Sequence, residues 1–274
     1  MAVKIHFVFW FLFPFMGWGQ NSSTLMGARQ AGMGYSSSVL TDEWSFFNNI
    51  GGIGKVNETN AIFAYDINPA LIGANRLAAA LQSPTKWGTA GVGIFRFGDD
   101  VYSEHLFSVG FGNTMGNTSL GAKCSYVQYR AEGFGTLTAI SLDFGGVTQL
   151  TNQISLGAYL TNLTQSKLTG AHNEHLPAKL VAGISFRPSD KVLVSTELEK
   201  DLMYPAIWRS GLEYTLYKKI FVRTGFNLNP NAAFFGLGAQ KKKIKMDYAL
   251  RFNQLTGTVH QASAVYLFAS KRFL

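Results

Sequence analysis

Ile244–Asn253, with the sequence IKMDYALRFN, alternates residue by residue between two kinds of side chain. Successive side chains of a β-strand point to opposite faces, so this period of two predicts a strand. One face would be apolar and the other would carry the charges: Ile244, Met246, Tyr248, Leu250 and Phe252 against Lys245, Asp247, Ala249, Arg251 and Asn253. One such strand fits a soluble sandwich as well as a barrel, so the interpretation depends on how often the pattern recurs.

The same alternation recurs along most of the chain. It is clear in 191–200, 208–216 and 220–228, and repeated segments of this kind between turn residues are typical of transmembrane barrels. Bacterial single-chain barrels also have an even number of strands. We therefore predict an all-β fold, an antiparallel up-and-down transmembrane β-barrel of about 14 strands. The strands are expected near 59–65, 74–82, 88–97, 103–112, 118–129, 136–145, 152–163, 177–187, 191–200, 206–216, 219–228, 231–239, 244–252 and 260–271.

The connections between these segments alternate in length. The short set comprises 83–86, 112–117, 149–152, 187–191, 216–219 and the lysine run near 241–245. The other set is mostly longer and comprises 66–75, 98–104, 130–135, 163–177, 200–205 and 253–258. Short turns at one end and longer loops at the other are expected of a barrel with both chain ends on the short-turn side.

Composition favours a chain whose exterior faces lipid. Charged residues make up 15% of the 274 residues, against roughly 25% in soluble proteins, while aromatic residues make up 14%. Beyond the N-terminus no apolar run approaches the roughly 20 residues of a membrane helix. A closed barrel is the remaining structure that satisfies its backbone in a bilayer.

The formal net charge of +8 is dense only at Lys241, Lys242, Lys243 and Lys245. A nucleic-acid partner requires a clustered basic face, so none is expected, and the lysine run is interpreted as a solvated turn near lipid headgroups. The single Cys124 excludes an intramolecular disulfide and a cysteine-based zinc cluster.

The N-terminus has the features of an export signal. Lys4 precedes the apolar segment 5–16, and Gly17 and Gly19 supply small residues for cleavage after position 19. A membrane anchor is the alternative. We expect three parts: a cleaved signal peptide at 1–19, a hatch at 20–56, and an outer-membrane barrel at 57–274.

The hatch contains Met26–Gly54, MGARQAGMGYSSSVLTDEWSFFNNIGGIG, which is too rich in Gly, Ser and Asn for a long helix. Several of its residues resemble the N-terminal signature of the FadL-like outer-membrane barrels, and most of all the PorV/PorQ branch of that family. In this chain Asn49 stands where the family motif has proline, and Ile50 where it has alanine. Fragments 174–186, 195–202, 223–226 and 247–252 are also similar to the family. The hatch motif implied by the resemblance is Gly27, Arg29, Gly32, Gly34, Trp44, Phe46, Asn48, Asn49 and Gly51.

The resemblance implies a fourteen-stranded barrel with its N-terminal segment folded into the lumen. FadL members pass hydrophobic compounds across the outer membrane. PorV-type members resemble shuttles and adaptors of the type IX secretion system. Both roles are therefore candidates for this chain.

Charged residues at inward positions of the predicted strands form a candidate lumen network. It could hold a catalytic carboxylate pair, but mixed charges on neighbouring strands favour an interstrand network that holds the hatch, with Arg29 as a partner. The members are Lys123, Arg187, Glu197, Glu199, Arg209, Glu213, Arg223, Lys245, Asp247 and Arg251.

The sequence gives no enzyme signal. His172 and His175 flank Glu174 in a manner that could hold a metal, although a solvated loop is the preferred interpretation, and no spacing selects a Ser–His set. We predict no catalytic residues, no metal and no cofactor.

The main functional hypothesis is a non-enzymatic accessory or adaptor in type IX protein secretion, with a secretion translocon or its cargo as partner. The alternative is a FadL-like channel with a small hydrophobic ligand, and a third hypothesis is a lipid hydrolase. Outer-membrane lipid is a partner in each. An apolar path past Phe46 and Phe47 would favour the channel. A lumen sealed by polar contacts, with apolar outer loops, would favour the adaptor.

Overall fold

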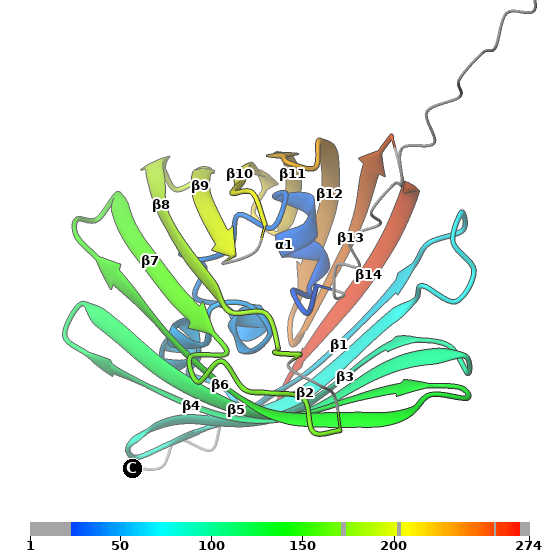
Figure 1. The fold of residues 1–274 in the computed structure, drawn as a ribbon. Coiled ribbons are helices and arrows are strands. Elements are labelled where there is room, and N and C mark those ends of the chain that lie inside the picture. The colour runs from blue at the N-terminus through cyan, green and yellow to red at the C-terminus, as the bar shows by residue number, and fades with distance from the viewer. Residues whose placement is uncertain (1–22, 171–173, 202–203, 255, 269–274) are drawn as a thin grey trace, which may run out of the picture.

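The computed structural model describes residues 23–170, 174–201, 204–254 and 256–268. In this part of the chain fourteen antiparallel strands close into one barrel, each paired with its sequence neighbours and β14 with β1 (Figure 1). The strands are β1 Asn60–Ile67, β2 Arg76–Thr85, β3 Gly88–Gly98, β4 Tyr102–Met115, β5 Thr118–Ala131, β6 Gly135–Gln149, β7 Ile154–Thr161, β8 Lys179–Ser189, β9 Val192–Asp201, β10 Ile207–Tyr217, β11 Ile220–Leu228, β12 Ala232–Lys241, β13 Ile244–Asn253 and β14 Gly257–Leu267.

The predicted fold class and all fourteen predicted strands are confirmed, with shifted ends. The main difference is that β4, β5 and β6 are longer than predicted, because they keep pairing past the alternating segments, as where Tyr102 lies opposite Ala131. The loops at 99–101 and 132–134 are consequently shorter than the 98–104 and 130–135 expected.

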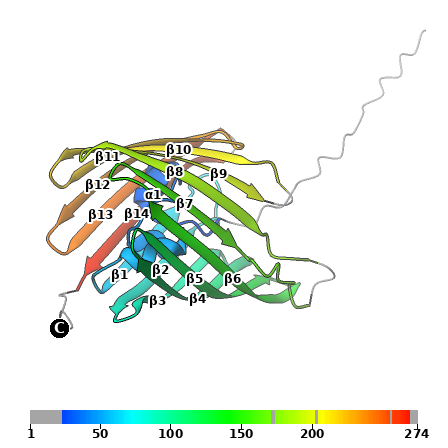
Figure 2. The ribbon, with the colours of Figure 1, turned by 90° about the vertical axis from the view of Figure 1, so that its left-hand side faces the viewer.

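The two ends of the barrel differ as the loop lengths predict. Turns such as 218–219 and 242–243 connect strands at one end, whereas the other end carries longer connections such as 68–75 and 162–178. Figure 2 shows the barrel from the side, with its strands inclined to its long axis. Strand β1 begins and β14 ends at the short-turn end.

The outer wall of the barrel is apolar. On β10, Trp208, Leu212 and Leu216 are 48%, 39% and 60% exposed, while Arg209 and Glu213 between them are buried. Such a continuous exposed apolar surface is the lipid-facing band of a transmembrane barrel. Among the described residues, no helix is long and apolar enough to cross a bilayer.

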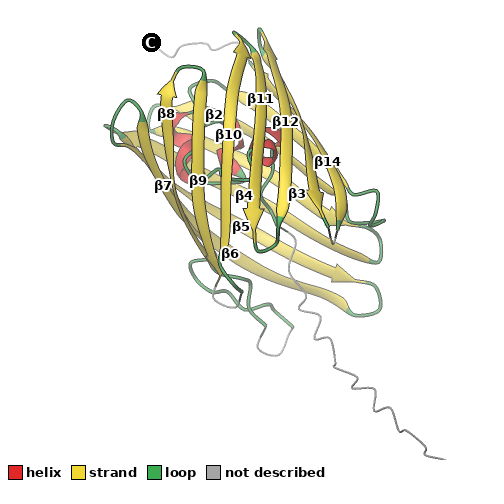
Figure 3. Ribbon diagram, turned by 90° about the horizontal axis from the view of Figure 1, so that it is seen from above, coloured by secondary structure: helices red, strands yellow, loops and turns green. Residues whose placement is uncertain are grey.

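The hatch lies inside the barrel, where Figure 3 shows its helices enclosed by the wall. It contains α1 Ala28–Gly32 and the 3₁₀ helices η1 Glu43–Phe46 and η2 Ile50–Lys55. Between residues 25 and 53 nearly every side chain is buried, so the hatch forms the core of the molecule. The predicted signal peptide, 1–19, lies outside the described residues.

Candidate functional site

One part of the hatch is held by apolar packing. The rings of Phe46 and Phe47 meet edge to face at 5.2 Å, and Trp44 packs beside them. This cluster lies against small wall residues, including Ala78 and Ala80 of β2. It gives the hatch a dry attachment to the strands near the beginning of the barrel.

A second part of the hatch is held by backbone contact with glycines of the wall. A Cβ added at Gly157 would overlap Ser38, and one added at Gly211 would overlap Met33. Sequence reasoning placed Gly211 on the inward face but missed its role. The signal was the recurrence of inward glycines on neighbouring strands, at Gly145, Gly157, Gly183, Gly211, Gly225 and Gly236.

Arg29 of α1 connects the hatch to β10. Its Nε and Nη2 donate to the two carboxylate oxygens of Glu213, at 2.8 and 2.6 Å, and its Nη1 donates to Asp42 at 2.8 Å. Arg223 donates to the same Glu213 at 2.6 Å and to Asp247 at 2.6 Å. The pKa of Arg29 lies well above its ordinary value: burial lowers it, and the carboxylates of Glu213 and Asp42 more than offset this.

Glu197 of β9 binds the hatch backbone directly. Its Oε2 accepts hydrogen bonds from the amides of Ser37 and Ser38, at 2.9 and 2.7 Å. Arg209 donates to Glu197 at 2.9 Å and to Glu199 at 2.6 Å, and Lys179 pairs with Glu199 at 3.2 Å, so two cations balance the two buried carboxylates. A buried carboxylate without such a partner would be strongly unfavourable.

Two further lysines attach the hatch to the wall. Lys245 donates to Glu43 at 2.7 Å. Lys123 donates to the carbonyl oxygen of Phe46 at 3.4 Å and forms an ion pair with Asp143 at 3.1 Å. The network predicted on the wall therefore includes carboxylates of the hatch itself, which the sequence did not identify.

A separate polar cluster was also missed. Arg76 of β2 forms an ion pair with Asp66 of β1, and Gln261 of β14 donates to the same carboxylate. Arg76 also donates to the Tyr35 hydroxyl at 2.9 Å and to the carbonyl of Ser23 at 2.8 Å. Burial raises the pKa of the Tyr35 hydroxyl, although Arg76 lowers it. Side chains alternate between the two faces along β1 and β2, and this pattern places Asp66 and Arg76 on the inward face. It could have identified the cluster from the sequence.

Two predicted members lie outside the ion-pair network. Arg187 is exposed and forms no ion pair with any described residue. Arg251 likewise lacks an ion pair within the described part of the chain, and its Nε is buried without a hydrogen-bond partner there. These two residues therefore do not take part in the ion-pair network, because no described carboxylate lies within ion-pair distance of either guanidinium.

The hatch motif has a local structural basis. Gly27 adopts φ 108° and precedes α1, while Gly34 adopts φ 66°, a region that glycine enters without steric cost. Asn48 Nδ2 donates to the carbonyls of Met26 and Trp44, at 2.8 and 2.7 Å. Gly32 lies against Gly236, where an added Cβ would be 2.9 Å from the Gly236 Cα.

The side chain of Asn49 forms hydrogen bonds both within the hatch and to the wall. Its Nδ2 donates to the carbonyls of Ser38 and Gly146, at 2.5 and 3.0 Å, and its Oδ1 accepts from the Gly51 amide at 3.0 Å. Asn49 caps η2 and joins the hatch to β6. The departure from proline at this position thus adds polar attachment that a proline could not supply.

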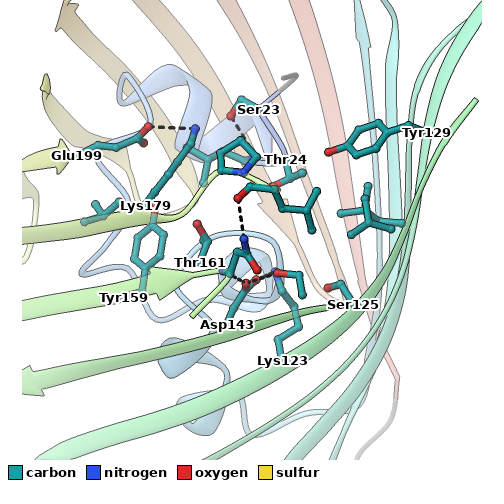
Figure 4. A pocket seen from close by; sticks show the side chains of 18 residues that line it. Ser23, Thr24, Lys123, Ser125, Tyr129, Asp143, Tyr159, Thr161, Lys179 and Glu199 are labelled. Carbon is teal, nitrogen blue, oxygen red and sulfur yellow. Dashed lines mark hydrogen bonds and ion pairs between the residues drawn. The ribbon is translucent and has the colours of Figure 1, made fainter. Parts of the chain in front are cut away.

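A cavity of about 110 Å³ lies between the hatch and the wall toward the long-loop end (Figure 4). Apolar side chains of Leu25, Leu106, Val127 and Val181 line part of it. The ion pairs Lys123–Asp143 and Lys179–Glu199, from four different strands, border it, with hydroxyl groups between them in Figure 4. The cavity can accommodate a small molecule with an apolar body.

The described parts of the β7–β8 connection, 162–170 and 174–178, close the side of this cavity. Its Leu168 and Leu176 are buried against Val127 and Ala139. The Thr169 amide donates to the Thr138 carbonyl at 2.8 Å, so the connection extends the sheet along β6 where β7 has ended. At the short-turn end two larger polar cavities, of about 350 and 380 Å³, share Arg29 and Arg187.

The described residues contain no group of three His, Cys, Asp or Glu side chains that could hold a metal ion. His172 lies outside the described residues. His175 Nδ1 lies 2.8 Å from the Gln165 carbonyl oxygen.

The fold is similar to solved transporter structures. The toluene transporter TodX of P. putida superposes on this chain with a TM-score of 0.66 at 14% identity. The superposition covers 91% of this chain and 100% of TodX. This chain shares the fold of TodX. For the toluene transporter TbuX of Ralstonia pickettii the TM-score is 0.65 at 15% identity, covering 90% and 99% of the two chains. A Pseudomonas aeruginosa FadL homologue gives 0.59 at 12% identity, covering 90% and 100%. The sequence matches no protein-family model and no curated protein.

Proposed function

We propose that this chain is a non-enzymatic outer-membrane barrel through which small hydrophobic compounds pass. The fold shared with two toluene transporters and a FadL homologue supports a transport role. The apolar exterior supports placement in a membrane, and a barrel with short turns at the end where its strands begin and finish is typical of the bacterial outer membrane.

The observation that carries the proposal is the cavity between the hatch and β5–β8. Its volume of about 110 Å³ is of the same order as the roughly 150 Å³ apolar cavity that holds benzene in an engineered protein. Leu25 of the hatch lines it, and Lys123 contacts both the cavity and the Phe46 carbonyl. A ligand in the cavity therefore touches groups that hold the hatch.

Passage requires the hatch to move. Between this cavity and the two polar cavities of the short-turn end, buried hatch residues fill the lumen, and the cluster around Phe46 and Phe47 is closed to solvent. A ligand that displaced Lys123 from the Phe46 carbonyl would weaken one attachment of that cluster. The proposed route thus runs from the cavity past the apolar part of the hatch.

Filling the cavity tests the transport proposal. Val127 is 3% exposed and lines the cavity, whereas Val109 on the neighbouring strand β4 is 45% exposed on the outer wall. In proteoliposomes, Val127→Trp should reduce toluene uptake at least fivefold while Val109→Trp leaves it unchanged. Equal uptake by both variants, each verified as folded by its heat-dependent migration in SDS, contradicts the proposal.

A second candidate function, the PorV/PorQ-type secretion accessory, is favoured by a different observation. The polar contacts of Arg29 and Glu197 seal the lumen, and apolar side chains are exposed on the long loops. Ile72 is 97% exposed and Phe134 is 90% exposed. Their loops are joined through the connection between β3 and β4: the Gly98 amide donates to the Asn75 carbonyl at 3.1 Å, and the Glu132 amide donates to the Val101 carbonyl at 2.8 Å.

This alternative predicts a partner at the long-loop end. Purification in mild detergent should recover a large secretion complex with the wild-type chain, and Ile72→Ser with Phe134→Ser should release it. Leu163→Ser, on another loop and 57% exposed, serves as the control and should retain the complex. Recovery of the chain alone, with toluene uptake intact, would leave only the transport function.

A further inference from the structure

The positive charge of the chain gathers at the short-turn end. The exposed cations there outnumber the exposed carboxylates of Glu58 and Asp190 within the described residues. At the long-loop end, Arg96, Arg130, Lys167 and Lys200 are balanced by Asp99, Asp100, Glu132 and Glu174. The exposed cations of the short-turn end are Lys86, Arg187, Lys191, Lys218, Lys219, Lys241, Lys242 and Lys243.

Three of these lysines occupy equivalent positions on consecutive hairpins. Lys191, Lys219 and Lys243 are the last turn residues before β9, β11 and β13. Their carbonyl oxygens accept hydrogen bonds from the next strand along the rim (β10, β12 and β14), from the amides of Thr215, Gln240 and Leu267 at 2.8, 2.9 and 2.8 Å. We call these three residues the lysine rim. They lie at one level along one side of the barrel.

The rim is confined to that side. On the other side the β2–β3 turn carries one cation, Lys86, while the β4–β5 turn, 116–117, and the β6–β7 connection, 150–153, contain no charged residue. Lys218 is not counted in the rim because it lines a cavity of the lumen. The excess of exposed lysines therefore lies on the β8–β13 side of the barrel mouth.

The depth of the lysine rim points to lipid as its partner. The β10–β11 and β12–β13 turns consist only of 218–219 and 242–243, so they cannot project far from the wall. Each lysine is followed directly by a residue of the apolar outer face, and Ile220 and Ile244 are 46% and 45% exposed there. The lysines therefore lie at the edge of the apolar band, at the level where lipid headgroups begin, and a long lysine side chain can reach a headgroup from there.

The β12–β13 turn holds a further lysine, Lys242, beside the rim residue Lys243. Lys242 adopts φ 52°, a left-handed conformation that glycine and asparagine enter more readily than lysine does. Turn geometry alone would favour those residues. Lysine is present despite a local preference against it.

We propose that the lysine rim binds the headgroups of anionic phospholipids in the leaflet that faces the short turns. The phosphate of the lipid would lie beside the ammonium groups of Lys191, Lys219 and Lys243, and its acyl chains would lie along the apolar wall below them. Near an anionic membrane surface each lysine contributes a factor of about five in affinity. The barrel would thereby collect anionic lipid on one side.

Binding of water-soluble short-chain phospholipids to the purified full chain in non-ionic detergent tests the proposal by calorimetry. Phosphatidylglycerol should bind at least about tenfold tighter than phosphatidylcholine, as expected for more than one lysine. Lys191→Gln, Lys219→Gln and Lys243→Gln together should abolish this preference, and the matching triple change to Arg should retain it. The control variant carries Lys86→Gln, Lys167→Gln and Lys200→Gln, which removes the same charge away from the rim and should keep the preference.

Three results would overturn the proposal. They are equal affinity for the two lipids, a preference that survives in the glutamine variant of the rim, and loss of the preference in the control variant. Inorganic phosphate is tested in parallel, and binding as tight as that of phosphatidylglycerol would show that a free anion, rather than a lipid, occupies the rim. Polyglutamate that binds tighter than the lipid and displaces it would indicate an acidic protein instead.

Discussion

The side chain of Arg29 connects the hatch both to the wall and to another part of the hatch. It donates to Glu213 on the wall and to Asp42 within the hatch, so it fixes both the position of α1 and the path of the chain toward η1. Glu213 is in turn shared with Arg223. Removing the guanidinium would leave the Asp42 carboxylate without its ion pair in a nearly closed space.

We predict that Arg29→Ala destabilises the hatch by about 2–4 kcal/mol, somewhat less than a fully buried pair because the Arg29 side chain is 22% exposed. Hydrogen exchange at hatch amides such as Ser37 and Ser38 measures this as faster exchange. Arg187→Ala is the matched control and should change exchange by less than about 0.5 kcal/mol, because Arg187 is exposed. Unchanged protection in the Arg29 variant would show that the hatch is held by other contacts.

At the scale of elements, the hatch and the strands fit because glycines thin the wall. Two adjacent glycines of β6, Gly145 and Gly146, face opposite sides of the wall. Gly145 points inward, and an added Cβ would overlap Asn49 and lie 2.9 Å from the Tyr159 Cβ. Gly146 points outward, and its added Cβ would lie 2.8 Å from the flexible end of Leu120. The same methyl group thus has different consequences on the two faces.

Gly145→Ala should displace η2 and destabilise the hatch by about 1–3 kcal/mol, the range expected for overpacking. Hydrogen exchange at Gly51 should accelerate, since its amide bonds to Asn49. Gly146→Ala should cost less than about 1 kcal/mol because the Leu120 side chain can move. If the two variants behaved alike, close contact between the wall and the hatch would not matter for stability.

For the whole molecule, the apolar exterior determines where the barrel is stable. Leu212 in the middle of β10 and Leu216 near its short-turn end both face outward. A charge at the first position would lie in the hydrocarbon, whereas a charge at the second would lie near the headgroups. The depth of a residue, rather than its exposure, should therefore set the cost of a charge.

Leu212→Arg should lower the free energy of unfolding in lipid vesicles by about 2–4 kcal/mol, and Leu216→Arg by about 0–1 kcal/mol. Urea titration in vesicles measures both values. Both side chains are exposed, at 39% and 60%, and a substitution on a wall that faced water would usually cost less than about 0.5 kcal/mol, so a cost of about 2–4 kcal/mol at Leu212 requires lipid. Equal costs would contradict a membrane-embedded wall.

The closed barrel makes a simpler prediction for the protein as isolated. Without a free sheet edge the strands should resist SDS at room temperature, so unboiled and boiled samples should migrate differently. Membrane fractionation should place the wild-type chain with the outer membrane. A soluble species whose migration does not depend on heating would contradict both the fold in lipid and the proposed location.

The sequence by itself determined the strands and their two faces. The alternation of Ile244–Asn253 assigned Lys245 and Asp247 inward and Met246 outward, since the period of two is a property of the extended backbone and can be read locally. The tertiary structure decided which inward groups meet. Arg29 reaches Glu213 across 184 positions of sequence, whereas Arg251 meets no carboxylate among the described residues. These pairings depend on the register of the closed barrel and on the path of the hatch within it, and both arise only when distant segments pack together.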